Sequence, residues 1–145
     1  MNDFNEKSAP TTRELVPEDQ RVAVATSLFG VWLDLKLEPA IWQISERLAR
    51  NYDQAAFFNW YILSNSGFYM APDEEEVFEV SSENYCSGTF LSADALGIVS
   101  SLYAFSHFSH SGDWEFPKTC AQHFQLLLHY ALRHREWVAI ERALF

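Results

Sequence analysis

The chain has 145 residues, of which 48% are hydrophobic and 16% aromatic, and its 20 acidic and 10 basic side chains give a formal net charge of −10. This length suits one domain, and so many bulky apolar residues exclude a disordered chain. The acidic balance disfavours direct binding of nucleic acid, because negative charge repels phosphates.

Several local features bear on where the protein works. No apolar run approaches the roughly 20 residues that a membrane helix needs. The first residues lack the basic and apolar stretches of a secretion signal. The two cysteines, Cys86 and Cys120, are too few for a disulfide framework and suit a reducing compartment. We therefore expect a cytoplasmic protein that does not contact membranes.

The chain shows no internal repeat or linker, so we predict a flexible tail over residues 1–14 and one domain over residues 15–145. Pro17 and two acids predict the start of a first helix, which Gly30 ends; its core positions would be Val22, Ala25 and Phe29. A second helix is expected to begin at Glu38-Pro39 and to bury Ile41, Ile44 and Leu48.

The middle of the chain has the pattern of strands. Residues 57–63 are apolar on both faces, and Asn65-Ser66-Gly67 suits a tight turn into a returning strand at 68–71. Residues 77–80 and 85–90 are two further strand candidates. Together they predict a small antiparallel sheet of about four strands, over residues of about 57–90.

Three helices are expected to follow the sheet. Ser92 would cap the first of them, and Thr119 with Gln122 would form a capping box for the second. A short last helix would bury Trp137, Ile140 and Leu144. Two helices, a sheet and three helices in succession predict the α+β class, since strands and helices are segregated along the chain.

Motifs for common enzyme chemistry are absent from the sequence, so we predict no catalytic residue, no cofactor and no metal. A weak metal candidate is His107 and His110 with Asp113, although histidines are also common in the last turn of a helix. A weak nucleophile candidate is Cys120 with His123, although Cys120 lies on an apolar stripe.

An aromatic cluster in the predicted strands could in principle stack on single-stranded nucleic acid; it comprises Phe57, Phe58, Trp60, Tyr61, Phe68 and Tyr69. Such surfaces need interleaved basic residues, and this segment has none, which favours core packing instead.

The whole net charge belongs to residues 51–117, which contain no lysine or arginine and ten acids: Asp53, Asp73, Glu74, Glu75, Glu76, Glu79, Glu83, Asp94, Asp113 and Glu115. We take six of these as a candidate interaction patch for a basic partner: Asp73, Glu74, Glu75, Glu76, Glu79 and Glu83. One turn of duplex DNA carries about 20 charges, so six carboxylates are too few to imitate it fully.

Several blocks of the sequence resemble the antirestriction proteins of the ArdB/KlcA type: VPEDQR at 16–21, LFG at 28–30, YILSNSGFYMAP at 61–72, LSADALGIVSSLYAFS at 91–106 and HFQLLLHYALRH at 123–134. Ser66 stands where that family is expected to have glycine. The resemblance implies a small cytosolic bacterial protein, carried by plasmids and other mobile elements, that protects incoming DNA from type I restriction–modification enzymes without catalysis.

The expected partner is therefore a type I restriction–modification complex, reached directly or indirectly. The resemblance supplies no binding residues, so the acidic patch is a separate hypothesis. Two alternatives stay open: a small enzyme with an unrecognised site around His107, His110 and Asp113, and a protein that binds DNA directly through a locally basic C-terminal end with Arg133, Arg135 and Arg142. The oligomeric state is not predicted.

Overall fold

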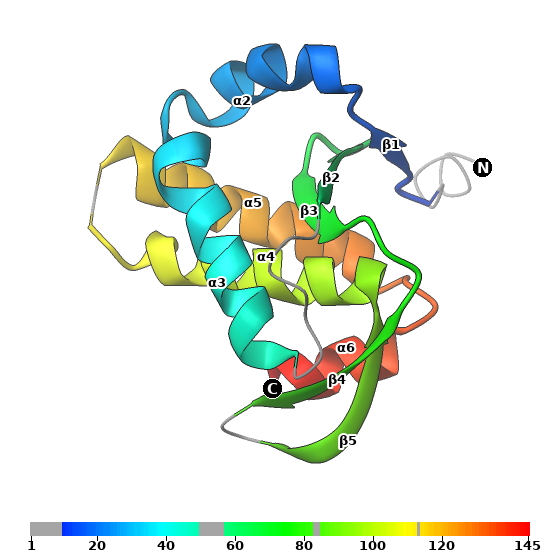
Figure 1. The fold of residues 1–145 in the computed structure, drawn as a ribbon. Coiled ribbons are helices and arrows are strands. Elements are labelled where there is room, and N and C mark those ends of the chain that lie inside the picture. The colour runs from blue at the N-terminus through cyan, green and yellow to red at the C-terminus, as the bar shows by residue number, and fades with distance from the viewer. Residues whose placement is uncertain (1–9, 50–56, 83–84, 113) are drawn as a thin grey trace, which may run out of the picture.

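The computed structural model describes residues 10–49, 57–82, 85–112 and 114–145. It confirms the α+β class: the helical part that contains α2 (Arg21–Phe29) and α3 (Glu38–Leu48) lies between the first strand and the other four, and three helices follow the last strand. Helix α4, Ala93–Ser109, runs through the middle of the molecule, and the other helices and both sheets are arranged around it (Figure 1). No helix in the described ranges combines the length and the apolar character needed to cross a membrane.

The N-terminal helical part begins and ends close to the predicted positions. A 3-10 turn, η1 (Glu18–Gln20), leads into α2 (Arg21–Phe29), and Gly30 ends that helix with a φ of 62°. A π-helical turn, η2 (Leu33–Leu37), continues directly into α3 (Glu38–Leu48). The predicted core position Val22 is wrong, since this side chain is 80% exposed. Helix α2 lies at the edge of the molecule and buries only Phe29, so few of its positions meet a core (Figure 1).

The first sheet has the order β1-β2-β3 and is antiparallel: β1 is Arg13–Leu15, β2 is Phe58–Leu63 and β3 is Phe68–Pro72. Arg13 and Glu14 thus belong to a strand, although they fall within the tail predicted over residues 1–14. Three residues are too few to show a strand period, so only their pairing with β2 reveals them. In the turn between β2 and β3, Ser66 has a φ of 76°, a conformation in which glycine is more usual.

The second sheet contains β4 (Val77–Ser82) and β5 (Tyr85–Ser92), which pair only with each other as strands. The predicted single sheet of four strands is therefore wrong, although its strands are confirmed. Pro72 ends β3, and the four acids that follow it have no regular structure, which separates the two sheets. The β4–β5 hairpin packs on α6, Trp137–Leu144.

Helix α4 is buried on almost every side, which its small residues allow. Gly97 lies against the backbone of β3: a Cβ at this position would be 2.3 Å from the carbonyl oxygen of Met70 and 2.4 Å from the Cα of Ala71. The Ser101 hydroxyl accepts a hydrogen bond from the Met70 amide at 3.3 Å. On the side facing α3, the Ser45 and Ser100 hydroxyls are 2.8 Å apart. The polar groups of this central helix are thus satisfied inside the core.

Of the C-terminal helices, one begins at its predicted cap and another begins earlier than predicted. Ser92 caps α4 as predicted, because its hydroxyl accepts the Ala95 amide at 3.1 Å. Helix α5 runs from Glu115 to Ala131, so it begins before the capping box predicted at Thr119. Pro117 lies in its first turn, where a missing N–H costs nothing, and this made an earlier start possible.

Candidate functional site

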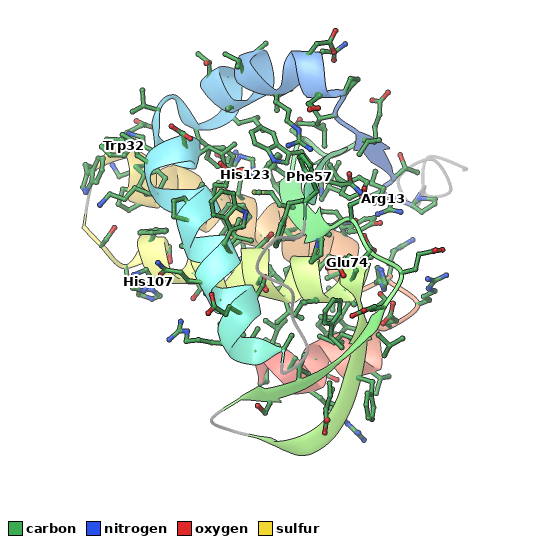
Figure 2. The ribbon with its side chains drawn as sticks, in the orientation of Figure 1. Arg13, Trp32, Phe57, Glu74, His107 and His123 are labelled. Atoms are coloured by element: carbon green, nitrogen blue, oxygen red, sulfur yellow. The ribbon has the colours of Figure 1, made fainter. Side chains whose placement is uncertain are left out.

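The acidic segment, residues 73–76, joins the two sheets. Its first residue is anchored, since the Asp73 amide donates a 2.7 Å hydrogen bond to the carbonyl oxygen of Phe57. Its last residue precedes Val77, where β4 begins. Figure 2 shows the labelled Glu74 on the side of the molecule where the chain passes from the first sheet to the hairpin.

The predicted patch is only partly an open surface. Asp73, Glu75 and Glu76 are exposed, whereas Glu74 and Glu79 are half-buried. Glu83 lies outside the described residues. The structure therefore brings together three exposed carboxylates in one segment, with Glu79 following on β4, and the charge here is that of a short chain segment rather than a broad acidic face.

A second polar cluster, which the sequence analysis did not predict, surrounds Asp94 at the start of α4. Its carboxylate accepts hydrogen bonds from Arg13 at 2.5 Å, from the Tyr69 hydroxyl at 2.6 Å and from His134 at 2.8 Å. Arg13 also donates to the Tyr69 hydroxyl at 3.0 Å and lies over the ring of Tyr61. These contacts tie β1, β3 and the connection after α5 to one carboxylate.

The hydrogen bonds of His134 define the tautomer of its ring. Its Nδ1 accepts the backbone N–H of Glu136 at 3.0 Å, so the proton of the neutral ring lies on Nε2 and is donated to Asp94. Burial disfavours the charge on Asp94, but the hydrogen bonds from His134 and Tyr69 and the charge of Arg13 outweigh it, so the pKa of Asp94 lies below its usual value. Burial and the neighbouring Asp94 raise the pKa of Tyr69.

This Asp94 cluster is suited to holding elements together rather than to proton transfer. Three donors occupy the carboxylate, and the raised pKa of Tyr69 opposes formation of a phenolate. Sequence reasoning assigned Asp94 to the first turn of a helix but missed its partners. Arg13, Tyr69 and His134 are far apart along the chain, and no local spacing connects them.

The predicted metal candidate is not assembled among the described residues. His107 lies in the last turn of α4 and His110 follows the helix, and both are exposed. The Nδ1 of His110 is 2.8 Å from the Ser106 carbonyl oxygen, which is a local contact at the end of the helix. Asp113 lies outside the described residues, and no three metal-binding side chains gather within the described ranges.

The pair of Cys120 and His123 is buried in the core. Cys120 is fully buried, and burial raises the pKa of its thiol to about 12, so a thiolate is disfavoured. The ring of His123 packs against Phe29 and Phe105, at centroid distances of 4.6 and 5.7 Å. Its Nδ1 has no hydrogen-bond partner among the described residues, and burial lowers its pKa to about 4. Both side chains thus stay neutral at pH 7.

Most of the aromatic cluster lies in the core, as predicted. Phe58, Trp60, Phe68 and Tyr69 are buried, and the rings of Trp60 and Phe68 meet edge to face at 5.5 Å. Tyr61 is half-buried under Arg13. Phe57 is the exception, because its side chain is 72% exposed beside the acidic segment.

Comparison with known proteins identifies the class to which this α+β fold belongs. The family described as antirestriction protein matches residues 50–144, so the chain belongs to the antirestriction protein family, and its resemblance to the ArdB/KlcA type is confirmed.

Particular relatives extend the likeness over nearly the whole chain. The antirestriction protein KlcA of Escherichia coli is 32% identical over 97% of this chain and 99% of its own length. The protein YafX of Escherichia coli strain K12 is 33% identical over 88% of this chain and 83% of its own length.

A solved structure from work on KlcA and ArdB has a TM-score of 0.84 and 34% sequence identity, and it covers 94% of this chain and 96% of that chain. It is described as showing that these two proteins have a novel fold and antirestriction activity against type I DNA restriction systems in vivo but not in vitro.

Proposed function

We propose that this protein protects incoming DNA from bacterial type I restriction–modification enzymes by binding a partner, without catalysing a reaction. The observation that carries the proposal is the structural match over almost the whole chain to a protein from the KlcA and ArdB work, at 34% identity. Those two proteins act against type I systems in vivo.

The difference between antirestriction activity in vivo and in vitro bears on the kind of partner that we propose. KlcA and ArdB are described as active against type I systems in vivo but not in vitro. We infer that this chain also needs a component supplied by the cell. The partner of this chain would then be the restriction complex in a form that exists in the cell, or another protein that is associated with that complex.

Plating of unmodified phage on cells with a type I system, with and without this chain, tests the proposal directly. We expect the protein to raise the plating efficiency by at least about tenfold, because restriction removes most unmodified phage. Phage carrying the host modification should plate equally in both strains. Equal plating of unmodified phage with and without the protein would contradict the proposed function.

The acidic segment is the proposed contact, since it offers a charge opposite to that of DNA-handling proteins. Replacement of Asp73 by Asn and of Glu74, Glu75 and Glu76 by Gln should reduce the protection of unmodified phage by about tenfold or more. Asp73, Glu75 and Glu76 are exposed, and glutamine keeps the shape of the half-buried Glu74, so the folded protein should persist.

The matched control removes the same charge elsewhere, through Asn or Gln at the exposed Glu14, Glu18, Asp19 and Asp34. This variant should still protect, because net charge alone is not the proposed determinant. If both variants protect as well as the unchanged protein, the acidic segment has no part in the contact.

A further inference from the structure

The β4–β5 hairpin has one face against the core and one face open to solvent. Phe78 pairs with Leu91 and Val80 with Thr89, and all four side chains are buried. The alternate pair, Glu79 opposite Phe90, points the other way, and Phe90 is 55% exposed. Side chains two residues apart share a face of a strand, so Val77 lies on this open side as well.

This open side is apolar for a surface next to solvent. Val77 is 58% exposed, and together with Phe90 it flanks the half-buried Glu79. We name Val77, Glu79 and Phe90 the outer hairpin face. A solvated antiparallel sheet normally presents polar residues on its outer side, so two large apolar side chains here depart from the expected pattern.

The outer hairpin face continues directly into the acidic segment, because Glu76 and Val77 are consecutive. At the other end of that segment lies the exposed Phe57, whose carbonyl oxygen accepts the Asp73 amide. Residues 57–92 include no lysine or arginine. Exposed apolar side chains therefore lie at both ends of the acidic segment, and residues 57–92 place no cation among them.

The mixture of side chains distinguishes between two kinds of partner. A protein groove that binds DNA offers basic side chains at the spacing of the phosphates. Contact with Phe90 or Val77 adds no binding free energy in such a groove. A protein segment with basic residues beside apolar ones can pair with the carboxylates and also bury the apolar side chains. Desolvated aromatic side chains often contribute most of the free energy of such contacts.

We propose that the outer hairpin face and the acidic segment together dock a basic, amphipathic segment of a partner protein. The inference rests on the proposed function, for which it supplies the class of partner and the side chains that bind it. The carboxylates steer and orient the partner, and Phe90 and Val77 supply the buried contact.

Replacement of Val77 and Phe90 by threonine tests the apolar half of the surface. Threonine keeps a high strand propensity, so the hairpin should persist, and each single variant is made as well in case the pair lowers stability. We expect the protection of unmodified phage to fall by about tenfold while all four acids of residues 73–76 remain. The control replaces the exposed Val22 and Trp42, on α2 and α3, by threonine and should protect fully.

The outcomes separate this inference from the proposed function. If the unchanged protein fails to protect phage, the proposed function is wrong. If the unchanged protein protects, and the single and double variants at Val77 and Phe90 protect equally well, only the docking inference is overturned.

A binding measurement with synthetic peptides gives a readout that is independent of phage. One helical peptide carries lysines on one side and leucines on the other, and a second has serine at every leucine position. The unchanged protein should bind the leucine peptide at least about tenfold more tightly, and this ratio should approach one in the variant at Val77 and Phe90. A ratio near one in the unchanged protein, or a ratio that the variant preserves, would overturn the inference.

Discussion

Replacement of Gly97 by alanine should lower the free energy of unfolding by about 3 kcal/mol or more, although alanine normally favours a helix by about 1 kcal/mol over glycine. The added Cβ would lie 2.3 Å from the Met70 carbonyl oxygen and 2.4 Å from the Ala71 Cα. These are backbone atoms, which cannot move aside as a flexible side chain can. Helix α4 would therefore have to move away from β3 and loosen the core.

Thermal unfolding followed by circular dichroism measures this effect, and we expect a decrease of roughly 10 °C in Tm. A suitable control is Gln122→Ala on α5, an exposed helical position where alanine meets no close neighbour of this kind. Gly97→Ala protein that melts within a degree or two of the unchanged protein would show that the α4–β3 contact is not as close as described.

Stability should decrease between about pH 6.5 and pH 4 because His123 is buried. An unfolded histidine has a pKa of about 6.5, whereas burial lowers the pKa of His123 to about 4 in the folded protein. The folded state thus binds the proton less readily than the unfolded state. The contribution of this group is fully present above about pH 6.5 and is lost as the pH falls toward 4, by about 3 kcal/mol in all.

His123→Phe should remove this pH dependence, since phenylalanine has no proton to gain and can pack between Phe29 and Phe105. Denaturant unfolding at several pH values compares the two proteins, with His129→Phe on the exposed side of the same helix as the control. The curves of the unchanged protein and of His123→Phe should diverge below pH 6.5. Parallel curves would show that His123 is not held neutral by burial.

Asp94 adds a separate acid dependence at lower pH. Its pKa is lowered in the folded state, so the stability it provides is present above about pH 4, the usual value for an unfolded aspartate. That contribution is lost as the pH falls through the lower folded value. This loss lowers the free energy of unfolding of the unchanged protein and of the His123→Phe variant equally.

Local signals predicted the helices well because their ends have specific chemistry. Gly30 adopts a positive φ at the end of α2, Glu38-Pro39 begins α3, and the Ser92 hydroxyl accepts a hydrogen bond from an amide of α4. One or two residues therefore specify each of these helix ends. Exposure was harder to predict, as Val22 shows. A helical period gives the spacing of apolar positions but does not show whether another element covers them.

Long-range pairing accounts for what the sequence did not reveal. The strand at Arg13–Leu15 exists through its pairing with β2, almost fifty residues later in the chain, and Asp94 finds its partners on three other elements. The acidic segment was evident from the sequence, but its apolar flank was not. Only the register of β4 and β5 shows that Val77 and Phe90 share the open side of the hairpin.

Two of the blocks that resemble the family, residues 61–72 and 91–106, lie in direct contact. They include β3 and most of α4, and they meet where Gly97 touches Met70 and Ala71. These two blocks therefore form a close packing contact that the fold requires. It explains why those blocks identified the family without indicating a binding surface.

The central place of α4 also has a consequence for synthesis of the protein. Both sheets and the flanking helices pack on α4, which begins only at residue 93. The residues before it therefore leave the ribosome before the helix on which they pack has been synthesised. Until α4 has emerged, Phe29, Ile41 and Phe68 lack the surface that will shield them from water. The nascent chain thus completes this core only after α4 has been synthesised.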